Sequence, residues 1–129
     1  WEPVTVVDPR AVIGTGSTLG EGSVVLATAY VSIDVALGPA THLNYGVTIG
    51  HDTTGGAGVT VLPGANVGGT VALGEGVLVG SGAVVLQDLS IGDAAVVGAG
   101  AVVTRAVAAR ATVVGVPARP IQPTGRRRG

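Results

Sequence analysis

Two histidines, His42 and His51, are the residues of this chain best suited to proton transfer, and Asp52 directly follows the second. An imidazole gains and loses its proton near neutral pH, so a histidine beside a carboxylate is suited to general base chemistry. The sequence has no cysteine, which excludes thiolate catalysis, disulfides and cysteine metal sites. His51 with Asp52 is therefore the first candidate for chemistry.

An internal repeat of six residues positions these side chains. From Ile13 to Val103 every sixth residue, here called a rung, is aliphatic with the single exception of Gly55, and glycine follows most rungs. A helix needs apolar residues every three or four positions and a simple strand needs alternation, so a period of six fits neither alone. Self-similarity at a fixed short period is typical of stacked repeat folds.

The repeat predicts an all-β fold, a single-stranded parallel β-helix of about five coils with a short C-terminal extension. Each hexad would form a short strand whose rung points inward, followed by a turn for which glycine supplies the geometry. Three hexads would close a triangular coil of eighteen residues, with equivalent strands roughly 4.8 Å apart. The core would be narrow and aliphatic, in agreement with a chain that has one Trp, two Tyr and no Phe.

The sequence divides into four parts. We expect residues 1–11 to be a lead-in or cap, 12–104 the β-helix, 105–121 a C-terminal segment and 122–129 a disordered basic tail. The glycines at 55, 56 and 58 predict either a locally weak coil or a loosened corner near the candidate base.

Residues eighteen apart should stack in one column along such a helix. His51 lies on a predicted corner with Gly69 next in its column, and Gly69 has no side chain to fill the space beside the imidazole. His42 points outward from a predicted strand and stacks on Thr60, without a comparable opening. A corner histidine is commonly an ordinary surface residue, but of the two His51 is the better candidate base.

The charges are unevenly distributed. Acidic residues are spread over 12–104, which contains no Lys or Arg, whereas all arginines but Arg10 follow residue 104. Nucleic acid binding needs a basic face, so the acidic body argues against it. No stretch of these residues has the pattern of a signal peptide, and no apolar run reaches membrane-spanning length. We expect a cytoplasmic protein that binds neither nucleic acid nor membrane.

The motifs resemble those of the hexapeptide-repeat acyltransferases, in particular the branch of sialic-acid O-acetyltransferases and bacillosamine-type sugar N-acetyltransferases. The similarity runs without gaps from about Val4 to Ile121. The segments that carry it are Leu43-Asn44-Tyr45-Gly46-Val47-Thr48-Ile49-Gly50-His51-Asp52, Pro63-Gly64-Ala65-Asn66-Val67, Val96-Val97-Gly98-Ala99-Gly100-Ala101-Val102-Val103 and Gly115-Val116-Pro117-Ala118-Arg119. The hexad alone specifies the superfamily, and the Asn44-to-Asp52 segment in register with the later motifs specifies the branch.

This resemblance implies a left-handed helix, a cyclic homotrimer and active sites between neighbouring copies. It implies direct transfer of acetyl from acetyl-CoA to an amine or hydroxyl of a sugar that is linked to a nucleotide. No metal is required. In that scheme His51 is the general base and Asp52 raises its basicity. Asn44 would contact the small-molecule sugar substrate. The positions that would contact acetyl-CoA are Thr60, Gly69, Ser81, Ala99 and Arg119.

Three departures from the family pattern bear on the acceptor and donor sites. The family usually has an N-terminal Rossmann-like domain that holds the nucleotide sugar, and the sequence does not include it. The position of Thr60 is often a histidine in the family. Gly55, Ala57 and Gly58 replace the usual pattern near the base.

Other functions remain open at this stage. A non-catalytic β-helix that serves as a trimerisation scaffold would leave His51 and Asp52 as surface residues. A γ-class carbonic anhydrase needs three histidine ligands for zinc, and this chain has two. An acyltransferase that uses acyl carrier protein is a further alternative, although the Gly-x-Pro-Ala-Arg ending favours CoA.

Overall fold

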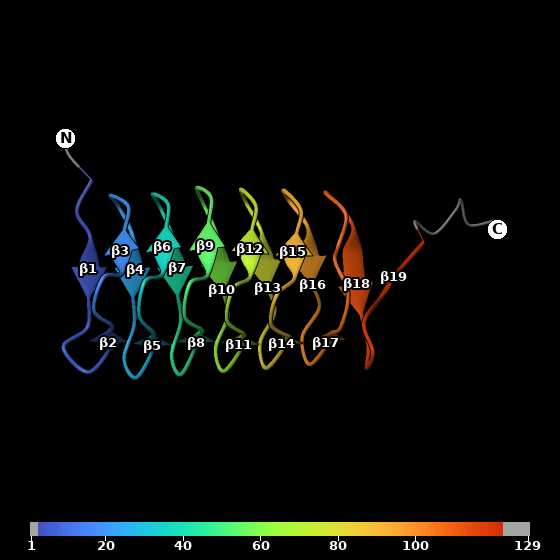
Figure 1. The fold of residues 1–129 in the computed structure, drawn as a ribbon, viewed down its shortest axis with the longest axis horizontal. Helices are drawn as coiled ribbons and strands as arrows, with labels where there is room; N and C mark the ends of the chain where they lie inside the picture. Colours follow the sequence, from blue (N-terminus) through green and yellow to red (C-terminus); the bar gives the residue numbers. More distant parts are fainter. Residues whose placement is uncertain (1–2, 123–129) are drawn as a thin grey trace, which may run out of the picture.

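Strands of two or three residues, separated by tight corners, make up the fold. The computed structural model describes residues 3–122, in which these strands wind into a β-solenoid of about six turns (Figure 1). The prediction of an all-β parallel β-helix is confirmed, and the number of turns is close to the five coils expected. Arg126–Arg128 of the expected basic tail lie outside the described residues.

Up to β17 each of the three sheets collects every third strand along the chain, and β18 and β19 then extend sheet A. Sheet A consists of β1 (Val6–Val7), β4 (Val24–Val25), β7 (His42–Leu43), β10 (Thr60–Val61), β13 (Leu78–Val79), β16 (Val96–Val97), β18 (Thr112–Val114) and β19 (Arg119–Pro120). Sheet B consists of β2 (Val12–Ile13), β5 (Tyr30–Val31), β8 (Thr48–Ile49), β11 (Asn66–Val67), β14 (Val84–Val85) and β17 (Val102–Val103). Sheet C consists of β3 (Thr18–Leu19), β6 (Ala36–Leu37), β9 (Thr54–Gly55), β12 (Ala72–Leu73) and β15 (Ser90–Ile91).

From β1 to β17 the strands pair in parallel with a register of eighteen residues. In sheet A, for example, His42 is the partner of Thr60, and Thr60 is the partner of Leu78. The register changes at the C-terminal end, where Val96 of β16 pairs with Thr112 of β18, and β19 turns back to pair antiparallel with β18. Residues eighteen apart therefore occupy the same place on successive coils, as the repeat predicts.

The rungs and the residues two before them form one continuous aliphatic core. Val61 and Val79 are fully buried, and so are Val59 and Val77 two residues before them. Gly55 does not interrupt the stack, because β9 still pairs with β6 and β12. A Cβ at Gly55 would lie 2.9 Å from Cδ2 of Leu37, so the Leu37 side chain already occupies the space of the missing rung.

The glycines that follow the rungs have a different role from the one expected of them. A Cβ on Gly80 would lie 2.6 Å from the backbone nitrogen of Ala99, so these glycines permit the close approach of the next coil. The left-handed conformation that the corners require occurs two positions later, at residues such as Gly82, Asp52 and Ala94. The expectation that the first glycine supplies the turn geometry was therefore wrong: contact between coils, not a positive φ, demands it there.

This distinction predicts losses of stability of different size for the same substitution at two glycines. Gly80→Ala should lower the free energy of unfolding by about 2–3 kcal/mol, because its new methyl group meets backbone atoms that cannot move aside. Gly55→Ala should change it by less than about 1 kcal/mol, because only the end of a flexible leucine must shift. Urea denaturation of both variants measures the difference, and equal losses of stability would contradict this account.

Candidate functional site

His51 and Asp52 lie together on the corner between β8 of sheet B and β9 of sheet C, here called the B–C corner. Asp52 has a φ of 59°, and its carboxylate Oδ2 lies 2.9 Å from Nδ1 of His51. Both side chains are more than half exposed. An exposed pair of this kind contributes little to stability, so the contact serves chiefly to orient the imidazole.

Gly69 follows His51 at the same corner, one coil along. The backbone N–H of Thr70 donates to the carbonyl of His51 at 2.8 Å, which fixes the two corners against each other. A Cβ built on Gly69 would lie 2.7 Å from Nε2 of His51. The imidazole therefore leans over the backbone of Gly69 with its Nε2 edge, and any side chain at residue 69 would displace it.

Thr53 secures this corner and was not identified from the sequence. Its buried hydroxyl donates to the carbonyl of Gly68 at 2.8 Å and accepts from the N–H of Val71 at 3.2 Å. These bonds join the corner of His51 to the corner of Gly69. A hydroxyl residue two before a rung is the signal, although Thr41 makes a comparable bond to a carbonyl elsewhere in the helix.

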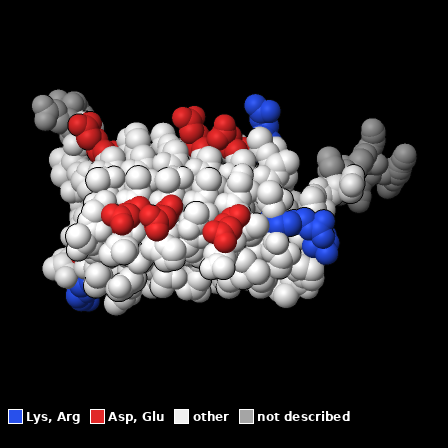
Figure 2. All heavy atoms as spheres, in the orientation of Figure 1, with Lys and Arg blue, Asp and Glu red and all other residues white. Residues whose placement is uncertain are grey.

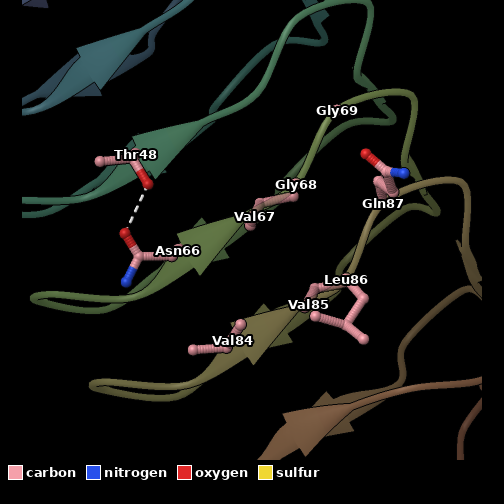
Figure 3. Close-up of a pocket in the computed structure, with 9 residues that line it drawn as sticks. All are labelled: Thr48, Asn66, Val67, Gly68, Gly69, Val84, Val85, Leu86 and Gln87. Carbon is pink, nitrogen blue, oxygen red and sulfur yellow. Dashed lines mark hydrogen bonds between the residues drawn. The ribbon is translucent and has the colours of Figure 1, made fainter.

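A cleft of about 510 Å³ opens beside Gly69 on the outer face of sheet B (Figure 3). Thr48 donates a hydrogen bond of 2.6 Å to the Oδ1 of Asn66 on one side of it. The residues that line the cleft are all uncharged, and the sequence alone gave no indication of them as a group. They are Thr48, Asn66, Val67, Gly68, Gly69, Val84, Val85, Leu86 and Gln87.

Some of the other predicted site residues lie elsewhere on the chain. Ser81 and Ala99 occupy successive coils at the corner between sheets A and B, where Gly100 N–H donates to the Ser81 carbonyl at 2.9 Å. Asn44 begins the same corner two coils earlier and is half-buried. Thr60 is on the outer face of sheet A. Within one chain, His51, Asp52 and Gly69 therefore lie together. Ser81, Ala99, Asn44 and Thr60 lie away from them.

Charge separates along the solenoid. Acidic side chains lie in rows along the face seen in Figure 2, and basic side chains lie towards the ends. Near the N-terminal end, Arg10 bonds Asp8 at 3.1 Å, and these hydrogen bonds lower the pKa of Asp8. Arg119, in β19, is exposed at the C-terminal end, and its guanidinium donates to the Ala118 carbonyl at 3.1 Å.

Residues 3–122 contain no group of three or more His, Cys, Asp or Glu side chains placed to hold a metal ion. The same part of the chain has no helix that is long and apolar enough to span a bilayer.

The Asp52 contact predicts the tautomer of His51. In the neutral imidazole the proton should reside on Nδ1, which donates to the carboxylate and leaves the Nε2 lone pair above Gly69. Asp52→Ala should shift neutral His51 towards the Nε2–H tautomer, and the corner accepts alanine because Ala40 and Ala94 have the same backbone conformation. Long-range ¹H–¹⁵N spectra measure this, with His42 as the internal control. An unchanged His51 tautomer would show that Asp52 does not set it.

Comparison with known proteins shows several similar solved structures. The acetyltransferase domain of PglB from Neisseria gonorrhoeae FA1090 superimposes with a TM-score of 0.92 at 32% identity, over 94% of this chain and 59% of that one. PerB from Caulobacter crescentus, in complex with CoA and GDP-perosamine, gives a TM-score of 0.93 at 33% identity, over 95% of this chain and 59% of that one. WeeI from Acinetobacter baumannii AYE gives a TM-score of 0.90 at 36% identity, over 92% of this chain and 58% of that one.

The chain thus spans about three fifths of the length of these proteins. No protein-family model and no curated protein sequence matches it. The similar structures confirm the left-handed β-helix, since superposition as rigid bodies preserves the hand of a coil. The similar structures are sugar N-acetyltransferases, and together with the hexad repeat this fold agrees with a hexapeptide-repeat acyltransferase.

Proposed function

We propose that this chain transfers an acetyl group from acetyl-CoA to an amine or hydroxyl of a sugar that is linked to a nucleotide. The observation that carries this proposal is the placement of His51, whose Nδ1 is held by Asp52 at 2.9 Å and whose Nε2 lies over Gly69. A base in this position has one nitrogen fixed and the other available at an open surface. That is the arrangement a general base needs.

In the proposed reaction Nε2 of His51 takes the proton of the acceptor as its nitrogen or oxygen attacks the thioester carbonyl. The new bond to the carbonyl carbon forms and the carbon–sulfur bond breaks. His51 then returns the proton to the sulfur, and CoA leaves as its thiol. The backbone N–H of Gly69 would stabilise the oxyanion. The proposed transfer is direct, and the sequence has no cysteine that could form an acyl-cysteine intermediate.

Support for the substrates comes from the similar structures. PerB was solved with CoA and GDP-perosamine, and the PglB domain with acetyl-CoA. Over the aligned part, the sequence identity with those proteins is about one third. This chain spans only about three fifths of their length. The identity of the sugar and its attachment to a nucleotide are therefore part of the proposal.

The donor and acceptor residues are assigned in keeping with the resemblance. Acetyl-CoA would lie along the groove between two copies of the chain, against Thr60, Gly69, Ser81 and Ala99, with Arg119 on a phosphate. Asn44 would contact the acceptor. The positions of Ser81 and Ala99, on a different corner from His51, support a site that needs a second copy to be complete.

We propose a cyclic homotrimer as the working form. Leu78 and Val96 on sheet A, and Val84 and Val102 on sheet B, face outward from their strands as apolar side chains. Closed packing of three copies would cover these strips, which a monomer leaves in contact with water. Sedimentation at micromolar concentration should give the mass of three chains. The mass of one chain would refute the proposal.

The test of the function separates donor binding from turnover. By calorimetry, His51→Ala should bind acetyl-CoA as the wild type does, whereas Arg119→Ala should bind about tenfold more weakly through loss of a charge-assisted hydrogen bond. With GDP-perosamine and other nucleotide-linked amino sugars as acceptors, His51→Ala should lower kcat about 10²–10⁴-fold. His42→Ala is the matched control, because His42 is exposed on the outer face of sheet A, and it should retain wild-type kcat.

Each contrary outcome has a distinct meaning. Failure of the wild-type chain to bind acetyl-CoA at low salt would remove the proposed enzyme and favour the non-catalytic trimerisation scaffold. Binding and turnover that survive His51→Ala would keep the enzyme and remove His51 as its base.

A further inference from the structure

Gln87 occupies the B–C corner two coils from His51, with Gly69 between them. The backbone N–H of Asp88 donates to the Gly69 carbonyl at 3.0 Å, just as that of Thr70 donates to His51 at 2.8 Å, so the three corners stack in sequence. The backbones of His51 and Gln87 are thus roughly 10 Å apart at the usual spacing of neighbouring strands. Gly69 has no side chain, and the imidazole of His51 leans over its backbone, so no side chain at residue 69 separates the imidazole from the corner of Gln87.

The Gln87 carboxamide is placed to contact a bound molecule. It lines the cleft beside Gly69, and in Figure 3 it lies between its own corner and the corner that carries Gly69. Among the residues drawn there, the Thr48 hydroxyl and the Asn66 carboxamide bond each other, whereas Gln87 bonds none of them. Its N–H groups and carbonyl therefore remain available on the wall of the cleft.

The charges around this corner restrict what Gln87 can do. Residues 12–104 contain no Lys or Arg, and Asp52 and Asp88 follow His51 and Gln87 directly. An oxygen that gains negative charge beside His51 during acyl transfer therefore has no Lys or Arg of the β-helix body to stabilise it. Apart from the imidazolium that forms when His51 takes the proton, the hydrogen-bond donors at this corner are neutral, namely backbone N–H groups and the side-chain amide of Gln87.

We infer that Gln87 is a catalytic residue whose carboxamide N–H donates a hydrogen bond to the carbonyl oxygen of the acyl donor. This inference rests on the proposed acetyl transfer. As the acceptor attacks, the carbonyl π electrons move onto this oxygen, and they return when the carbon–sulfur bond breaks. Gln87 neither gains nor loses a proton. It acts with the Gly69 N–H as a second donor to the oxyanion, opposite the imidazole that accepts the proton.

Infrared difference spectra of bound acetyl-CoA labelled with ¹³C at the carbonyl test this contact directly. A hydrogen bond weakens the carbonyl bond, so binding to the wild type should shift the labelled band to lower frequency. Gln87→Ala should lose most of that shift while it binds unacetylated CoA, which has no thioester carbonyl, with unchanged affinity. Gln122→Ala is the matched control and should shift the band as the wild type does.

Turnover gives a second measure. Loss of one oxyanion donor lowers kcat by about 10²–10³-fold, so Gln87→Ala should show a fall of this size at saturating concentrations of both substrates, with little change in KM for acetyl-CoA. An unaltered band shift in Gln87→Ala would overturn the inference, as would a rise in KM for the acceptor with kcat unchanged, which would place Gln87 on the acceptor. If the wild type binds no acetyl-CoA, the proposed function fails and this inference fails with it.

Discussion

Hydrogen bonds between the backbones of consecutive coils are the constraint on which the rest of the structure depends. Equivalent bonds recur throughout the helix. For example, the His42 N–H donates to the carbonyl of Val59 at 2.8 Å, and the Thr60 N–H donates to the carbonyl of Val77 at 2.9 Å. They fix the separation of the coils, so a side chain directly after a rung collides with the next coil where the two backbones touch. This explains why glycine follows so many rungs and why the register of eighteen residues holds from β1 to β17.

The same register assembles the candidate site. His51 meets Gly69 because the two are eighteen residues apart, and Thr53 holds their corners together through bonds to Gly68 and Val71. An insertion of one residue between His51 and Gly69 would place a different residue beneath the imidazole and would turn the following rungs away from the core. Fold and chemistry are therefore specified by one periodicity.

The sequence predicted the features that depend on period and failed where contacts decide. Counting by six and by eighteen was sufficient for the strands, the core and the stacking of His51 on Gly69. The conformation of Asp52 was not predicted, because the left-handed residue of each corner can be Gly, Asp, Thr or Ala and leaves no single letter to find. Gln87 was missed because its significance comes from an open space beside Gly69. The hand of the helix came from the family resemblance, since periodicity is the same for either hand.

The outward orientation of the corner side chains has an evolutionary consequence. His51, Ser81 and Gln87 all stand two positions after a rung, where the side chain is exposed and does not fill the core. Substitution there changes what the surface recognises at little expense in folding free energy. New substrate preferences can therefore arise by single mutations at corner positions that take no part in the chemistry, without compensating changes in the scaffold. The glycines one position earlier that touch the next coil, such as Gly80, have no such freedom.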